Sequence, residues 1–146
     1  MKTYSSVISE FEVDGSLRDI YIFDTNKDVW NNLIQFINKL SYKHEFRHGE
    51  KEISLPNEFD DIKKLQETDS TILKIFINNI IQVNCHFFTE SEIEMDITPN
   101  EITDEEKYNM LIMFLKWLSD SLNKPTVLTH ENAPELVILT IESKNA

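Results

Sequence analysis

Residues 90–106 constrain the fold of this chain more than any other segment. They contain eight acidic residues and no lysine or arginine. Within them, three apolar residues alternate with three acids, which is the two-residue period of a half-buried strand. The apolar positions are Ile93, Met95 and Ile97, and the acidic positions are Glu92, Glu94 and Asp96. The segment therefore predicts a strand with one face in a core and the other covered by carboxylates.

The residues before this strand predict its hairpin partner. The apolar face of residues 80–88 would carry Ile81, Val83, Cys85 and Phe87, and its polar face Gln82, Asn84 and His86. With residues 89–91 as the turn, the expected register places Phe88 opposite Glu92, His86 opposite Glu94 and Asn84 opposite Asp96. We therefore expect Gln82, Asn84 and His86 to form a polar cluster beside the acidic row.

Other periodic segments predict the remaining elements. The spacing of apolar residues predicts amphipathic helices over residues 26–40 and 104–123, and a Pro-Asn pair starts a short helix that ends near residue 67. The expected capping boxes pair Thr25 with Asp28 and Thr103 with Glu106, and Asn123 is expected to end the second helix. Further strands are expected over residues 7–13, 17–23, 42–47, 52–55, 72–77, 126–129 and 136–142, with tight turns at Asp14-Gly15 and Asn78-Asn79.

This order of elements predicts an α+β fold. Strands outnumber helices and hairpins connect most of them, so we expect a mostly antiparallel sheet of hairpins packed against two amphipathic helices. An alternative is two small sheets that share the two helices. The chain has 146 residues, of which 40% are hydrophobic, so we expect residues 1–146 to form a single domain around one core.

The charge of the chain limits its partners. The formal net charge is −12, and residues 76–146 carry 12 acids against four bases. Such a surface repels phosphate groups, so we expect neither a nucleic acid nor an anionic membrane as a partner. No segment is apolar enough to cross a bilayer, and a single cysteine is typical of a reducing compartment. We therefore expect a cytoplasmic protein.

His86 is the strongest candidate for chemistry in this sequence. Beside Glu94 or Asp96, its imidazole could serve as a general base or as part of a metal site, although a solvated polar face is the simpler interpretation. Cys85 points to the opposite face of the same strand, where we expect it to pack in the core. His44 and His48 share a strand face, but a zinc site needs further ligands. The sequence contains no motif that predicts a cofactor.

Three segments resemble small bacterial proteins of a single domain. They are residues 84–88 (Asn-Cys-His-Phe-Phe), residues 92–97 (Glu-Ile-Glu-Met-Asp-Ile) and residues 128–135 (Leu-Thr-His-Glu-Asn-Ala-Pro-Glu). In size and acidity the whole chain resembles the immunity proteins among them, which bind and neutralise a partner toxin. The resemblance rests on no diagnostic motif and assigns no family residues. It implies a non-enzymatic inhibitor of a basic protein, because an acidic patch speeds encounter with a basic surface.

This hypothesis predicts an acidic interface on the strand of residues 92–97 and just after it. Its expected residues are Glu92, Glu94, Asp96, Glu101, Asp104 and Glu105. A second hypothesis is a small metal-dependent hydrolase that uses His86 with Glu94 and Asp96. A third is a homo-oligomeric structural module, such as a homodimer, that pairs through an exposed strand edge or an uncovered sheet face.

Overall fold

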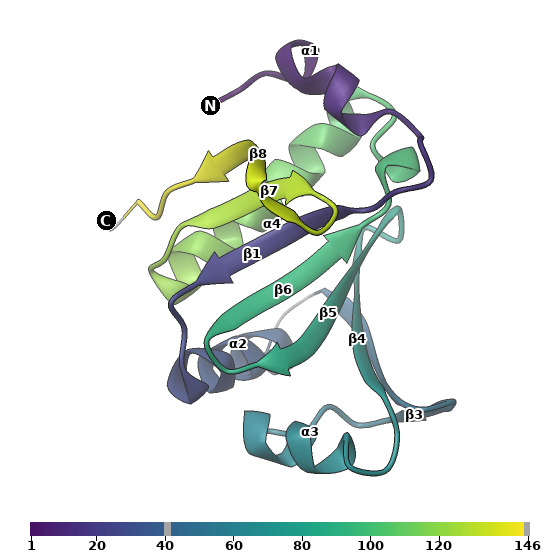
Figure 1. Cartoon of the computed structure of the whole chain (residues 1–146), viewed down its shortest axis with the longest axis vertical. Helices are drawn as coiled ribbons and strands as arrows, with labels where there is room; N and C mark the ends of the chain where they lie inside the picture. Colours follow the sequence, from purple (N-terminus) through teal and green to yellow (C-terminus); the bar gives the residue numbers. More distant parts are fainter. Residues whose placement is uncertain (40–41, 145–146) are drawn as a thin grey trace.

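The computed structural model describes residues 1–39 and 42–144, and one antiparallel sheet forms its centre (Figure 1). Within these residues, eight strands lie in the order β3-β2-β4-β5-β6-β1-β7-β8. They are β1 (Arg18–Phe23), β2 (Lys43–His48), β3 (Lys51–Ile53), β4 (Thr71–Ile77), β5 (Ile81–Thr89), β6 (Glu92–Ile97), β7 (Thr126–His130) and β8 (Ala133–Ile141). The α+β prediction is confirmed, and the alternative of two small sheets is wrong.

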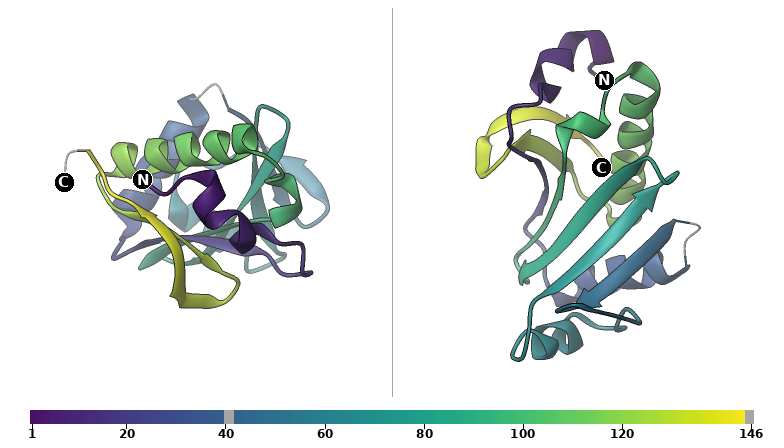
Figure 2. Two further views of the ribbon diagram at one scale, coloured as in Figure 1. Left: turned by 90° about the horizontal axis from the view of Figure 1, so that it is seen from above. Right: turned by 90° about the vertical axis from the view of Figure 1, so that its right-hand side faces the viewer.

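Helices cover one face of this sheet. The helical elements are α1 (Tyr4–Val7), the 3-10 turn η1 (Ile8–Phe11), α2 (Lys27–Lys39), α3 (Phe59–Leu65), the 3-10 turn η2 (Pro99–Glu101) and α4 (Glu105–Leu122). The two long helices, α2 and α4, contact each other on the same side of the sheet, while the β7–β8 hairpin projects on the other side (Figure 2). The two predicted amphipathic helices are therefore confirmed, except that residue 40, the predicted end of the first, lies outside the described residues.

The sheet face beneath α2 and α4 forms the hydrophobic core. Alternate residues of the central strands are buried there, namely Ile20, Ile22, Val83, Cys85, Phe87, Ile93 and Met95. Trp30 of α2 is also fully buried, and its ring centroid lies 5.1 Å from that of Phe59 and 5.0 Å from that of Phe87. Burial raises the pKa of the Cys85 thiol, so Cys85 is a packed core residue and not an activated nucleophile.

The turn between β4 and β5 follows the local prediction. Asn78 and Asn79 have φ angles of 51° and 57°, which are left-handed values that asparagine tolerates better than most residues. This turn sets Ile77 opposite Ile81, so the apolar residues of both strands fall on the core face. The predicted hairpins of residues 42–55 and 72–97 are likewise present as β2–β3 and β4–β5–β6.

The first predicted strand, residues 7–13, is wrong. Residues 4–11 form α1 and η1, which bury Val7 and Phe11 against α4, where the Phe11 ring lies 6.0 Å from Tyr108. A spacing of four residues suits one face of a helix as well as one face of a strand, so this pattern does not distinguish them. β1 consequently pairs with β6 and β7 instead of with an N-terminal hairpin strand.

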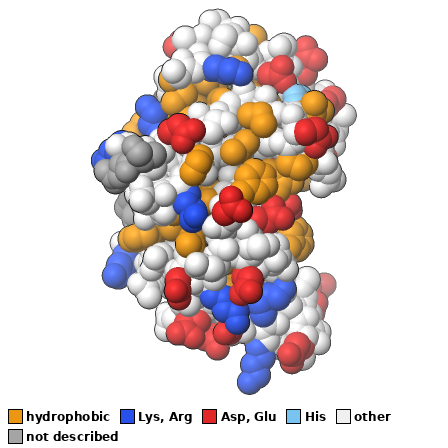
Figure 3. Space-filling model, turned by 60° about the vertical axis from the view of Figure 1, so that its left-hand side comes forward, with side chains coloured by type: hydrophobic (Ala, Val, Ile, Leu, Met, Phe, Trp, Pro, Cys, Tyr) orange, Lys and Arg blue, Asp and Glu red, His pale blue; other side chains and the backbone are white. Residues whose placement is uncertain are grey.

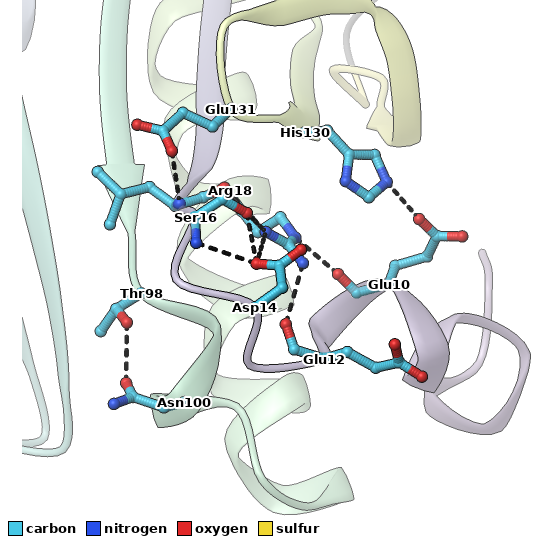
Figure 4. Close-up of polar contacts among 10 residues, drawn as sticks. Glu10, Glu12, Asp14, Ser16, Arg18, Thr98, Asn100, His130 and Glu131 are labelled. Atoms are coloured by element: carbon cyan, nitrogen blue, oxygen red, sulfur yellow. Dashed lines mark hydrogen bonds and ion pairs between the residues drawn. The ribbon is translucent and has the colours of Figure 1, made fainter.

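A buried arginine holds this N-terminal segment in place (Figure 4). Arg18 is 1% exposed. Its guanidinium donates hydrogen bonds to the backbone carbonyls of Glu10 at 2.6 Å and Glu12 at 3.2 Å, and to the Ser16 hydroxyl at 2.7 Å. The Arg18 side chain therefore satisfies two backbone carbonyls that would otherwise need a neighbouring strand. These hydrogen bonds explain how the segment remains compact outside the sheet.

Two helix caps differ from the prediction by one residue. The Asn26 side chain, not Thr25, accepts the free backbone N–H of Val29 at the start of α2. At the start of α4, Asp104 accepts the N–H of Lys107 at 2.9 Å, and the predicted Thr103 box does not form. Asn123 ends α4 with a left-handed φ of 53°, as expected. Across residues 1–39 and 42–144, no helix has the length and apolar character needed to cross a membrane.

Candidate functional site

The candidate site is the open face, by which we mean the side of β1, β6 and β5 that is turned away from α2 and α4. Its side chains lie in three rows that run across the strands. The rows are Asp19–Asp96–Asn84, Tyr21–Glu94–His86 and Phe23–Glu92–Thr89. The predicted pairs of His86 with Glu94 and of Asn84 with Asp96 are confirmed, whereas Thr89 and not Phe88 lies opposite Glu92.

The predicted polar cluster forms one hydrogen-bond network with Asp96. The Gln82 amide donates to Asn84 Oδ1 at 2.7 Å, and the Asn84 amide donates to Asp96 Oδ1 at 2.9 Å. His86 Nε2 donates to Asp96 Oδ2 at 2.6 Å, so the ring bonds its diagonal neighbour and not Glu94 directly opposite. Asp96 thus orients the imidazole and stabilises its charged form.

Asp96 therefore differs from its predicted role as an exposed interface acid. Both of its oxygens accept hydrogen bonds from within the sheet, and the residue is only 8% exposed. Its neighbour Asp19 is 4% exposed and accepts hydrogen bonds from the Tyr21 hydroxyl at 3.2 Å and from the backbone N–H of Asn132 at 2.8 Å. The β7–β8 turn, which contains Asn132, covers this end of the open face.

Asp19 is a buried acid that alternation alone does not reveal. Burial raises the pKa of its carboxyl, and the nearby charges of Asp96 and Glu131 act in the same direction. The sequence signal for this buried acid is an aspartate between Arg18 and Ile20, at the start of a largely apolar strand. Such a residue must find hydrogen-bond donors when it is buried, and here they come from its own strand and from the distant β7–β8 turn.

The other end of the open face keeps its acids available. Glu92 and Glu94 are partly exposed. Burial is the largest cause that raises the pKa of Glu94, while a hydrogen bond from Tyr21 lowers it and the charges of Asp19 and Glu92 raise it. These two carboxylates thus remain partly exposed, and the charge of His86, opposite Glu94, lowers the pKa of Glu94.

Aromatic side chains lie on both sides of these two acids. On β1, the Tyr21 and Phe23 rings stack with centroids 5.2 Å apart. On β5, the His86 and Phe88 rings stack with centroids 5.1 Å apart and an interplanar angle of 3°. Phe23 is 39% exposed and Phe88 63% exposed. Large apolar residues at polar-face positions are the sequence signal for this feature, and hydrophobic side chains do gather beside Asp and Glu on the face seen in Figure 3.

A bulge in β5 places Phe88 on the surface. The register between β5 and β6 shifts between His86 and Thr89. The carbonyls freed by the shift are satisfied from the helices: Lys63 of α3 donates to Phe88 O at 3.1 Å, and Trp30 Nε1 of α2 donates to Thr89 O at 3.1 Å. Hydrogen bonds from α2 and α3 therefore stabilise the bulge. Because of the bulge, the predicted pairing of Phe88 with Glu92 does not form.

The three remaining predicted interface acids lie away from this end. Glu101, in η2, accepts a hydrogen bond from the backbone N–H of Gln82 at 3.2 Å. Asp104 caps α4 and pairs with the Lys107 ammonium at 2.8 Å, while Glu105 is exposed in the first turn of that helix. These residues follow the C-terminal end of β6, whereas Glu92 begins the strand. The structure therefore does not bring the six predicted acids into one patch.

The other histidines take structural roles. His48 Nε2 lies 2.8 Å from the carbonyl oxygen of Leu65, at the end of α3, and the Thr68 hydroxyl lies 3.0 Å from the same nitrogen. His130 Nε2 donates to a Glu10 carboxylate oxygen at 2.5 Å, which ties the N-terminal segment to the end of β7 (Figure 4). In the part of the chain that the structure describes, no group of three or more His, Cys, Asp or Glu side chains is placed to hold a metal ion.

Comparison of this chain with protein-family models, with curated proteins and with solved structures finds no match in any of the three.

Replacing His86 with glutamine is expected to destabilise the protein more at low pH than at high pH. The hydrogen bond to Asp96 is the main cause that raises the pKa of His86; burial opposes it, and the charges of Asp96, Glu94 and Asp19 add to it. A raised folded-state pKa means that the stabilisation is complete below the unfolded value of about 6.5 and is lost as the pH rises through the folded value. We expect a loss of about 1 kcal/mol at the lower pH.

Urea unfolding on both sides of the histidine pKa measures this difference. The matched control is His44→Gln, because His44 Nδ1 lies 3.4 Å from a backbone carbonyl, that of Tyr42, and not beside a carboxylate. The control measures what the loss of a histidine side chain costs where no carboxylate accepts its hydrogen bond. An equal loss at every pH for His86→Gln would show that its charged form does not stabilise the fold.

Proposed function

We propose that this chain is a non-enzymatic protein-binding module of the immunity type, which binds and inhibits a basic protein such as a toxin domain. The observation that carries the proposal is the uncovered end of the open face, where the partly exposed Glu92 and Glu94 lie near the exposed rings of Phe23 and Phe88. Aromatic side chains are enriched among the residues that dominate binding energy at protein interfaces. Carboxylates beside them would select a positively charged surface.

The charge of the whole chain supports the same kind of partner. At a net charge of −12, the protein attracts a basic protein over long distances and speeds its encounter. An inhibitor of this kind needs a displayed surface and not a catalytic group. The proposal includes a bacterial source and a cytoplasmic location, which agree with the single, buried, free Cys85.

Reversing the two exposed acids is expected to abolish capture of the partner. The full chain is immobilised, exposed to a lysate of its source organism at low salt, and eluted with salt, and the eluted protein is purified. For that protein, Glu92→Lys with Glu94→Lys should weaken binding by more than about 100-fold, because close charge pairs at an interface are each worth about 1.5 kcal/mol or more. Association rates measured at several salt concentrations should lose most of their salt dependence.

The matched control is Glu105→Lys with Glu106→Lys on the first turn of α4. It changes the net charge by the same amount on exposed residues that lie outside the open face. We expect it to slow association slightly and to leave the dissociation rate unchanged. Equal losses for the two double variants would show that only the net charge matters, and capture of no basic protein by the parent chain would contradict the proposed function.

A further inference from the structure

We propose that the exposed end of the open face recognises arginine side chains of the basic partner, with carboxylates of β6 that pair with the guanidinium groups and the exposed Phe23 and Phe88 rings on which they stack. The inference rests on the proposed function and specifies the chemistry of the partner. We call the six residues concerned the aromatic–acid strip. They are Tyr21, Phe23, His86, Phe88, Glu92 and Glu94.

The strand register creates this arrangement. Glu94 lies between Tyr21 on one side and His86 on the other, and Glu92 lies between Phe23 and the β5 bulge that carries Phe88. The ring pair on each outer strand is stacked: the buried Tyr21 ring supports the exposed Phe23 ring, and the His86 ring supports the exposed Phe88 ring. Stacking restrains the rings before a partner arrives, which lowers the entropic cost of binding.

The acids of the strip have no lysine or arginine partner among the described residues. Among residues 1–39 and 42–144, no lysine or arginine forms an ion pair with Glu92 or Glu94, although exposed acids elsewhere do form such pairs, as Asp60 does with Lys27 at 3.1 Å. Burial is the main cause that raises the pKa of Glu94, whereas the Tyr21 hydrogen bond and the charge of His86 lower it. A cationic side chain from a partner would form the ion pair that no lysine or arginine among these residues forms with Glu92 or Glu94.

Arginine suits this strip better than lysine. A guanidinium is planar, stacks on aromatic rings and offers a fork of donors that matches a carboxylate, whereas an ammonium is compact and more strongly hydrated. Alternate residues on one strand are separated by about 7 Å, so Glu92 and Glu94 match two arginines at alternate positions of an extended partner segment. The strip therefore predicts a preference for an Arg-X-Arg pattern.

Peptide titration tests this preference without knowledge of the partner. The probes are the capped peptides Arg-Ser-Arg and Lys-Ser-Lys, which have equal charge, and the readout is the amide chemical shifts of the isotope-labelled full chain. We expect the arginine peptide to bind about two- to fivefold more tightly. The shifts should concentrate on β1, β6 and the β5 bulge.

Two variants and one control make the test specific. Glu94→Gln and Phe88→Ala should each reduce the affinity for the arginine peptide by about two- to fivefold, and Phe88→Ala should also remove most of the preference over lysine. Glu105→Gln, which removes a charge from the exposed start of α4, should change neither quantity. Equal affinities for the two peptides, shifts located elsewhere, or an equal loss in the control would overturn the inference.

This test can fail independently of the proposed function. A partner that is captured and then lost on reversal of Glu92 and Glu94, while the peptides show no preference for arginine, would overturn the arginine inference alone. Arginine-selective binding at the strip without any captured basic protein would overturn the proposed function and leave the recognition chemistry in place.

Discussion

Replacing Arg18 with alanine is expected to lower the free energy of unfolding by about 3 kcal/mol, because hydrogen bonds to a charged group contribute about 1.5–3 kcal/mol. Arg18 is 1% exposed and contacts the carbonyl oxygens of Glu10, Glu12 and Leu17 and the hydroxyl of Ser16. Without the guanidinium, these acceptors lose their donor and the packing of α1 and η1 on α4 weakens. The expected result is a looser N-terminal segment as well as a less stable protein.

Urea unfolding monitored by tryptophan fluorescence measures the loss, and hydrogen exchange of residues 4–11 reports the looser segment. Arg18→Met keeps much of the apolar stem and should remain strongly destabilised, because the missing donors and not the missing volume cause the effect. Asp14→Asn is the control: it removes the 3.7 Å ion pair to Arg18 from an exposed position and should leave the free energy of unfolding nearly unchanged. A small effect of Arg18→Met would mean that packing, and not hydrogen bonding, holds the segment.

Trp30→Ala is expected to be similarly severe, with a loss of about 3–5 kcal/mol for a fully buried tryptophan. Its ring fills the space between Phe59 of α3 and Phe87 of β5, and its indole N–H donates to the Thr89 carbonyl at the bulge. The variant therefore loses core packing and one support of the bulge together. We expect the surface position of Phe88 to become less well defined as a result.

Trp30→Phe separates these two contributions. Phenylalanine retains most of the apolar contact but cannot bond Thr89, so it should cost less stability than alanine while still weakening arginine-peptide binding. Trp117→Ala is the matched control for loss of a tryptophan, because Trp117 is only partly buried, beside Tyr42 and Phe114. It should cost less than Trp30→Ala and leave peptide binding unchanged. Full peptide affinity in a folded Trp30→Phe protein would show that the indole hydrogen bond does not position the bulge.

The central hairpin was the most predictable part of the candidate site. The two-residue period assigns Val83, Cys85 and Met95 to the core face, and it assigns Glu92 and Glu94 to the opposite face, as the structure has them. Period and turn length are local properties of the chain, so they determine which residues share a face and which residues pair. The α+β class follows from the same local signals.

The details of the open face depended on contacts that the local pattern does not contain. Asp96 was expected to be an exposed acid, but it is buried because Asn84 and His86 bond it from β5. Phe88 was expected opposite Glu92, but a bulge supported by Trp30 and Lys63 displaced it. In both cases side chains form hydrogen bonds with a polar group, the Asp96 carboxylate or the backbone carbonyls at the bulge. From the strand pattern alone, that group would bond to water or to a neighbouring strand.

The sequence by itself determined most of the strands, the two long helices and the division of the central hairpin into an apolar and a polar face, because these follow from residue spacing and turn chemistry over a few positions. Only the tertiary structure decided which acids remain available to a partner. Asn132 reaches Asp19 across 113 positions of the chain, and the Trp30 indole reaches the β5 bulge across 59. Such contacts form only when distant elements pack, because burying a polar group requires a hydrogen-bond partner that its own neighbours do not supply.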